Sequence, residues 1–107
     1  MGYLQKKAGG KNSWHLRFVV LDIKGRVLHY YIKETDDTPR KTIDLSSVKL
    51  ERVSGETKKD HDGFKIIGPN LSPRLIFVTA EKKNCDEWID ALENALGALA
   101  ILYFFFF

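Results

Sequence analysis

The chain changes its hydrophobic period once, and this change limits the folds that it can adopt. Up to Thr79, short runs of alternating, β-branched and aromatic residues are separated by Gly, Pro, Asn and Asp, the pattern of strands joined by turns. From Cys85 to Leu99, apolar residues recur every three or four positions with acidic residues between them, which predicts one amphipathic helix. A chain of 107 residues suits one domain with one core. We therefore expect an antiparallel β-sandwich or barrel followed by one C-terminal helix.

The strand-like segments are short, and their connections are of hairpin or modest length, which favours antiparallel pairing. Along the second segment, Arg17 and Val19 share one face. Leu16 and Phe18 share the other. We expect the C-terminal helix to cover an open end of the barrel, with Trp88 filling that end as a core residue. The seven expected strands span residues 3–6, 14–22, 27–33, 41–45, 48–53, 64–67 and 75–79.

The end of the chain has a different composition, because residues 95–107 carry no charge. As a helix this run would span about 20 Å, less than the roughly 30 Å core of a bilayer. Three interpretations remain open: a truncated transmembrane segment, an apolar anchor in the membrane interface, or a fragment boundary or misread frame without function. We expect the domain to comprise residues 1–96 and the apolar tail, residues 97–107, to lie outside it.

Basic residues are concentrated at the start of the chain. Residues 1–33 contain seven Lys and Arg residues and a single acid, Asp22, whereas the whole chain has a net charge of only +3. Such an asymmetry predicts a basic patch for an anionic partner. The alternative is that the lysines keep an edge hairpin soluble. We do not expect nucleic-acid binding, because the patch is compact and the aromatic residues beside it belong mostly to strands.

The residues that catalysis or cofactor binding would require do not occur in the necessary patterns. The sequence has no phosphate-binding G-x-x-x-x-G-K-[ST] motif and no G-x-S-x-G motif. His15, His29, His61 and Cys85 are not spaced as metal ligands. We therefore expect no enzyme activity, no cofactor and no metal. A single cysteine and no signal-peptide pattern predict a cytoplasmic protein, which we expect to be monomeric.

Several short motifs follow one another in a specific order: 2–6 (GYLQK), 14–21 (WHLRFVVL), 28–31 (LHYY), 39–40 (PR), 43–45 (IDL), 64–66 (FKI), 80–81 (AE) and 88–92 (WIDAL). This ordered set resembles the pleckstrin-homology (PH) domain family, over residues 2 to about 96. The resemblance implies a seven-stranded antiparallel barrel of two nearly orthogonal sheets, with four and three strands, capped by the amphipathic helix.

The resemblance also implies a site for phosphoinositide head groups at the open end of the barrel, between the first three strands. Lys6 and Arg17 match the lysine and the arginine of lipid-binding members, and Tyr30 matches a tyrosine that donates to a phosphate. Arg40, just after Pro39, resembles an arginine that reaches the pocket in members selective for 3-phosphorylated lipids. The supporting candidates are Lys7, Lys11 and His15.

These residue types suit phosphate, because arginine offers forked donors and lysine a compact charge. His15 stands where strong binders carry Lys or Arg, and histidine is less charged near neutral pH, so we expect weaker binding that strengthens as the pH falls. The expected function is a phosphoinositide-binding module that recruits its parent protein peripherally to the inner face of cell membranes, with 3-phosphorylated lipids as the favoured candidates. The alternative is a protein-interaction module with weak, nonspecific attraction to anionic membranes.

Overall fold

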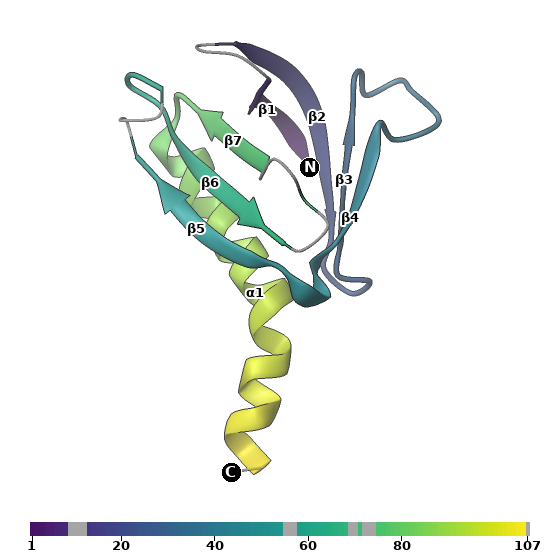
Figure 1. Ribbon diagram of the computed structural model, residues 1–107, viewed down its shortest axis with the longest axis vertical. Coiled ribbons are helices and arrows are strands. Elements are labelled where there is room, and N and C mark those ends of the chain that lie inside the picture. Colours follow the sequence, from purple (N-terminus) through teal and green to yellow (C-terminus); the bar gives the residue numbers. More distant parts are fainter. Residues whose placement is uncertain (9–12, 55–57, 69–70, 72–74, 107) are drawn as a thin grey trace.

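The structure is a computed structural model that describes residues 1–8, 13–54, 58–68, 71 and 75–106. Seven strands and two helices lie in this part of the chain (Figure 1). All seven expected strands are present, but two of them end earlier than expected: the third ends at Tyr31 instead of residue 33, and Leu45 begins a short 3-10 helix instead of ending a strand. In chain order the elements are β1 (Gly2–Lys7), β2 (Trp14–Asp22), β3 (Val27–Tyr31), β4 (Lys41–Asp44), η1 (Leu45–Ser47), β5 (Lys49–Val53), β6 (Asp62–Ile67), β7 (Leu75–Thr79) and α1 (Lys82–Phe106).

The strands form one antiparallel sheet in the order β4-β3-β2-β1-β7-β6-β5. The sheet is continuous, rather than divided into two, because β1 pairs with β2 along its length and also with β7 at Gln5 and Lys6. The strands on either side of this junction number four and three, as expected. β4 and β5 are the two edges of the sheet, so the strands curl into an open half-barrel rather than a closed barrel.

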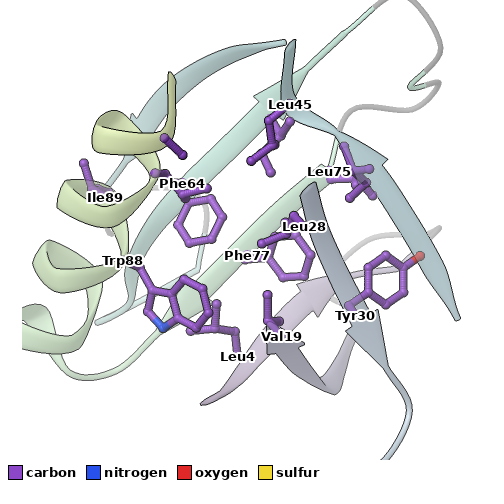
Figure 2. Close-up of a cluster of buried hydrophobic side chains, with 14 of the residues drawn as sticks. Leu4, Val19, Leu28, Tyr30, Leu45, Phe64, Leu75, Phe77, Trp88 and Ile89 are labelled. Carbon is purple, nitrogen blue, oxygen red and sulfur yellow. The ribbon is translucent and has the colours of Figure 1, made fainter. Parts of the chain in front are cut away.

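The core lies between the concave face of the sheet and the first turns of α1. It contains fifteen buried side chains, among them Leu4, Val19, Phe64 and Phe77 (Figure 2). Trp88 is buried as expected, and its ring centroid lies 6.2 Å from that of Phe64. The helix therefore holds one large aromatic side chain against Phe64 of β6 and near Gly2 of β1. Packing of an apolar face of this kind is the main source of helix stability in proteins.

The helix continues past residue 96, where we expect the domain to end. α1 begins at Lys82, before the first apolar position at Cys85, and runs without interruption through residue 96 to Phe106. Its last turns extend beyond the sheet, at the end of the molecule opposite the β3–β4 connection (Figure 1). Within the described residues, α1 and η1 are both too short or too polar to cross a membrane.

We predict that the domain folds without the apolar tail. Leu92 and Ala95 are buried and Leu96 packs against the core, so a chain that ends at Leu96 keeps the helix residues known to contact the sheet. We expect its melting temperature to lie within about 3 °C of that of the full chain, since the shorter chain keeps every residue of the core cluster. Thermal denaturation followed by circular dichroism measures this, and a decrease of more than about 8 °C would show that residues 97–107 belong to the domain.

Candidate functional site

The inner face of β2 carries a basic side chain next to the core. Val19 is fully buried, and Arg17, two residues earlier, lies on the same face where the sheet opens. The Nη1 atom of Arg17 donates to the main-chain oxygen of Leu16 over 2.8 Å. Its Nη2 atom donates to Nδ1 of His15 over 3.2 Å, because a guanidinium group cannot accept. In the part of the chain that the structure describes, Arg17 has no carboxylate partner, so its charge is available to an anion.

Lys6 occupies the neighbouring position on β1. The register of the two strands places Lys6 opposite His15 and Leu4 opposite Arg17, so that Lys6 and Arg17 are diagonal neighbours on the inner face. The Nζ atom of Lys6 lies 5.5 Å from the centroid of the Tyr30 ring. This distance allows a cation–π contact that fixes the lysine over the end of the core.

Tyr30 marks the boundary between the core and the basic residues. Its ring is 7% exposed and packs edge-on against Phe77, with 6.0 Å between the centroids. The hydroxyl group points away from Phe77 (Figure 2), a direction that the sequence could not reveal. Burial raises the pKa of Tyr30, and the charges of Arg40 and Arg17 oppose this increase. The phenol is therefore a neutral donor near two guanidinium groups.

Two further cations near Tyr30 are Arg40, in the β3–β4 connection, and Lys41, in β4. The main-chain nitrogen of Arg40 donates to the main-chain oxygen of Tyr30 over 2.8 Å, which fixes this part of the β3–β4 connection. Lys41 pairs with Tyr30 in the β3–β4 register. Sequence reasoning missed Lys41, although it stands two positions before the buried Ile43 and so shares the inner face of β4.

Three of these four cations act on the fourth, Lys6. Burial lowers the pKa of Lys6, and the charges of Arg17, Lys41 and Arg40 lower it further. None of these four side chains forms an ion pair with a residue that the structure describes. By contrast, Lys49 and Lys65 share the carboxylate of Glu51, at 3.6 and 3.4 Å. The cluster formed by Lys6, Arg17, Arg40 and Lys41, here called the cation cluster, is thus an uncompensated positive charge around one phenol.

The supporting candidates lie in different places. His15 is on the inner face, beside Arg17 and opposite Lys6. Lys7 lies on the outer face of β1, away from the cation cluster, and its Nζ atom is 5.3 Å from the centroid of the Trp14 ring. Lys11 is outside the described residues. The structure therefore brings Lys6, Arg17, Tyr30, Arg40 and His15 together and separates Lys7 from them.

Elsewhere in the described residues, a hollow, a cysteine and possible metal ligands offer alternative sites, and each is a poorer candidate. A hollow of about 210 Å³ lies between β2 and α1, but the one charged side chain in its lining is the acidic Glu87, and no Lys or Arg side chain lines it to hold a phosphate. Cys85 is buried on the helix, and burial raises the pKa of its thiol, which disfavours the nucleophilic thiolate. The residues described contain no group of three or more His, Cys, Asp or Glu side chains that could hold a metal ion.

Comparison with known proteins identifies relatives of the whole domain. The family model described as PH domain matches residues 1–97. Pleckstrin homology domain-containing family O member 1 of Gallus gallus is 29% identical over 109 residues, which cover 90% of this chain and 25% of the relative. The chain thus spans about a quarter of the length of this curated relative.

Two solved structures share the fold. The PH domain of human oxysterol binding protein-related protein 11 superposes with a TM-score of 0.74 at 21% identity, over 91% of this chain and 78% of that one. The C-terminal PH domain of pleckstrin, in complex with D-myo-Ins(1,2,3,4,5)P5, gives a TM-score of 0.71 at 25% identity, over 89% and 94% of the two chains. The half-barrel with its C-terminal helix and the match over residues 1–97 show that this chain belongs to the PH domain family.

Proposed function

We propose that this PH domain binds phosphoinositide head groups and brings its parent protein to the inner face of cell membranes. The observation that supports the proposal is the cation cluster, in which four basic side chains surround Tyr30 without a carboxylate partner among the described residues. A polyanion is the ligand that such a cluster favours, because its phosphates would offset the repulsion that, after burial, lowers the pKa of Lys6. The related domain of pleckstrin was solved with an inositol pentakisphosphate.

The residues suggest a division of roles toward the head group. Arg17 can offer two parallel donors to one phosphate, and the ammonium group of Lys6 can bridge two phosphates. Tyr30 can donate its hydroxyl proton, because its phenol stays neutral. Arg40 approaches from the β3–β4 connection and would contact a phosphate on a different ring position. We propose that this contact produces a preference for 3-phosphorylated lipids.

Co-sedimentation with vesicles tests the proposal. The full chain and a chain ending at Leu96 are compared on neutral vesicles, phosphatidylserine-rich vesicles and vesicles that each contain one phosphoinositide. Selective retention of both chains on vesicles with one phosphoinositide supports the head-group site. If Arg40→Ala abolishes retention on 3-phosphorylated lipids and leaves retention on other phosphoinositides unchanged, the proposed preference for 3-phosphorylated lipids is supported. Equal binding to all vesicles, or binding that requires residues 97–107, would contradict it.

We predict that head-group binding strengthens as the pH falls from about 7.5 to about 6, because histidine is the side-chain type whose charge commonly changes near neutral pH and His15 lies beside Arg17 and opposite Lys6. In the structure His15 accepts a hydrogen bond from Arg17, which only an unprotonated ring nitrogen can do. A bound phosphate would attract both side chains and favour the protonated imidazole. Calorimetric titration with a soluble inositol polyphosphate should show about a threefold to tenfold gain at the lower pH, and His15→Lys should remove this dependence. An unchanged pH profile in His15→Lys would exclude His15 as its source.

A second candidate function is protein interaction, which the hollow between β2 and α1 favours. Leu21, Ile23, Trp88 and Ala91 give it an apolar lining, and Glu87 suits a basic residue of a partner. The charge-reversal variant Lys6→Glu/Arg17→Glu separates the two functions. It should abolish lipid binding while a partner held in the hollow is retained.

A further inference from the structure

The connection between β3 and β4 carries an exposed threonine that the proposed head-group site does not use. Thr38 is followed by Pro39, and the chain then continues with Arg40 and Lys41, two members of the cation cluster. Residues 32–38 are all exposed, and the connection projects from the sheet (Figure 1). The Thr38 hydroxyl therefore lies on a protruding segment, directly before the basic residues of the candidate site.

The hydrogen bonds that hold this connection do not involve the Thr38 side chain. The main-chain nitrogen of Lys33 donates to the Asp36 carboxylate over 3.1 Å, and that of Arg40 donates to the main-chain oxygen of Tyr30 over 2.8 Å. These bonds fix the two ends of the connection. Among the residues that the structure describes, the hydroxyl of Thr38 has no hydrogen-bond partner. An enzyme that approaches from solvent can therefore reach this oxygen without first breaking a bond to it.

The residues around Thr38 match the acceptor pattern of proline-directed protein kinases. These kinases modify a Ser or Thr that precedes proline, and one class of them also selects a basic residue three positions after the acceptor. Here that residue is Lys41, which is exposed in the edge strand β4. The following proline also favours an extended backbone at Thr38, which suits the substrate groove of a kinase. The chain contains one other such pair, Ser72-Pro73, but Leu75 occupies its third position, so the pattern is complete at Thr38 alone.

The charge of the chain changes sign at Thr38. Asp36 and Asp37 precede it, and Arg40 and Lys41 follow it. A phosphothreonine carries about −1.5 to −2 charges at neutral pH, so the two carboxylates would repel it and the two bases would attract it. Two residues span at most about 7 Å between Cα atoms, which the long side chain of arginine can bridge. A phosphate on Thr38 would therefore pair with Arg40, which has no carboxylate partner within the described residues.

We propose that Thr38 is phosphorylated by a proline-directed kinase and that its phosphate weakens head-group binding by occupying Arg40. The hydroxyl oxygen attacks the γ-phosphorus of ATP, so that a new O–P bond forms, the bond to the β-phosphate oxygen breaks, ADP leaves and a kinase carboxylate takes the hydroxyl proton. The inference rests on the proposed function, because the new phosphate competes with the head group for the same cations. Lys6 and Arg17 stay available, so binding weakens without being abolished.

Treatment of the full chain with a purified cyclin-dependent kinase and ATP, followed by mass spectrometry of its peptides, tests the modification site. One phosphoryl group should appear on Thr38, and much less on Ser72. Thr38→Ala should remove this group, and Lys41→Ala should slow its transfer by about tenfold or more, because the selected base is absent. A peptide of residues 33–43 that is phosphorylated while the folded chain is not would overturn the site, since the fold would then shield Thr38.

Calorimetric titration with soluble inositol 1,3,4,5-tetrakisphosphate then compares the phosphorylated and unphosphorylated chains. Phosphorylation should lower the affinity by about tenfold to hundredfold, the contribution of one charge-assisted contact. Thr38→Glu should lower it in the same direction. Thr35→Glu makes the same change at an exposed threonine of the same connection, five residues from Arg40, and should stay within about twofold of wild type. Equal losses for the two variants would overturn the pairing with Arg40, because they would indicate a general effect of added negative charge.

A measurement without the head group separates this inference from the proposed function. In a phosphorus NMR titration, the phosphate on Thr38 should lose its second proton at a lower pH in wild type than in Arg40→Ala, because the guanidinium group favours the dianion. The same titration in both proteins would overturn the pairing. Head-group affinity that phosphorylation leaves unchanged overturns the regulation and leaves the proposed function intact. If the unphosphorylated chain binds no head group, the proposed function is contradicted, while a titration that depends on Arg40 still supports the pairing.

Discussion

The variant Lys6→Ala/Arg17→Ala should lose at least about 100-fold in affinity for a phosphoinositide head group. Each residue can make charge-assisted hydrogen bonds to phosphate, which contribute about 1.5–3 kcal/mol each. The loss of two such contacts amounts to about 3–6 kcal/mol, or a factor of roughly 10² to 10⁴ in the dissociation constant. Calorimetric titration of a soluble inositol polyphosphate measures the effect without any contribution from the apolar tail.

The loss should come from the site and not from unfolding. Burial and the charges of Arg17, Lys41 and Arg40 lower the pKa of Lys6 in the folded chain. A base whose pKa is lower in the folded than in the unfolded state costs stability in full below the folded-state pKa, and this cost disappears as the pH rises from the folded-state to the unfolded-state pKa. Lys6→Met keeps the apolar stem and removes the charge. We therefore expect it to unfold at the same or a higher temperature than wild type at neutral pH, while it binds the head group more weakly.

Two results would contradict this account. Head-group affinity that survives in Lys6→Ala/Arg17→Ala would place the ligand outside the cation cluster. A large decrease in the melting temperature of Lys6→Met would show that the charge of Lys6 stabilises the folded domain. Lys41→Ala offers a further check, because its charge also lowers the pKa of Lys6, and it should weaken binding although no sequence motif identifies it.

The fold could be predicted from the sequence because its signals are local. Turn residues separate the strands, and the change of period marks the helix. The joining of the two halves of the sheet could not be predicted in the same way. It depends on two residue pairs between β1 and β7, Gln5 with Val78 and Lys6 with Phe77, which are far apart in the sequence and have no periodic signature. The direction of curling that follows from this pairing decides which face of each strand becomes the inside.

The candidate site could also be predicted only in part from the sequence. Lys6, Arg17, Tyr30 and Arg40 could be proposed together because each matches a motif. Their proximity is now explained by strand alternation and by the hydrogen bond between Arg40 and Tyr30. Lys41 required knowledge of the inner face of β4, a strand of four residues in which Ile43 alone is buried.

The variant Gly63→Ala should destabilise the domain by about 3 kcal/mol or more. Gly63 lies in β6 opposite Val78 of β7. An added Cβ atom would lie 1.8 Å from the main-chain oxygen of Phe77 and 2.7 Å from Cα of Val78. Both are backbone atoms of a paired strand, so neither can move aside unless the β6–β7 ladder separates. Phe77 is also a central core residue, and a displacement of its strand would disturb the packing under α1.

Gly2→Ala provides the control, because it makes the same chemical change in β1 where space is available. An added Cβ atom there would come no closer than 4.0 Å to the Trp88 ring, which is an ordinary contact. Its effect on the free energy of unfolding should stay within about 0.5 kcal/mol. A domain of this size loses about 4–8 °C per kcal/mol, so thermal denaturation should show a decrease of at least about 12 °C for Gly63→Ala and little change for Gly2→Ala. Equal melting temperatures for the two variants would mean that β6 and β7 can separate at this position without cost, which the close backbone approach at Gly63 argues against.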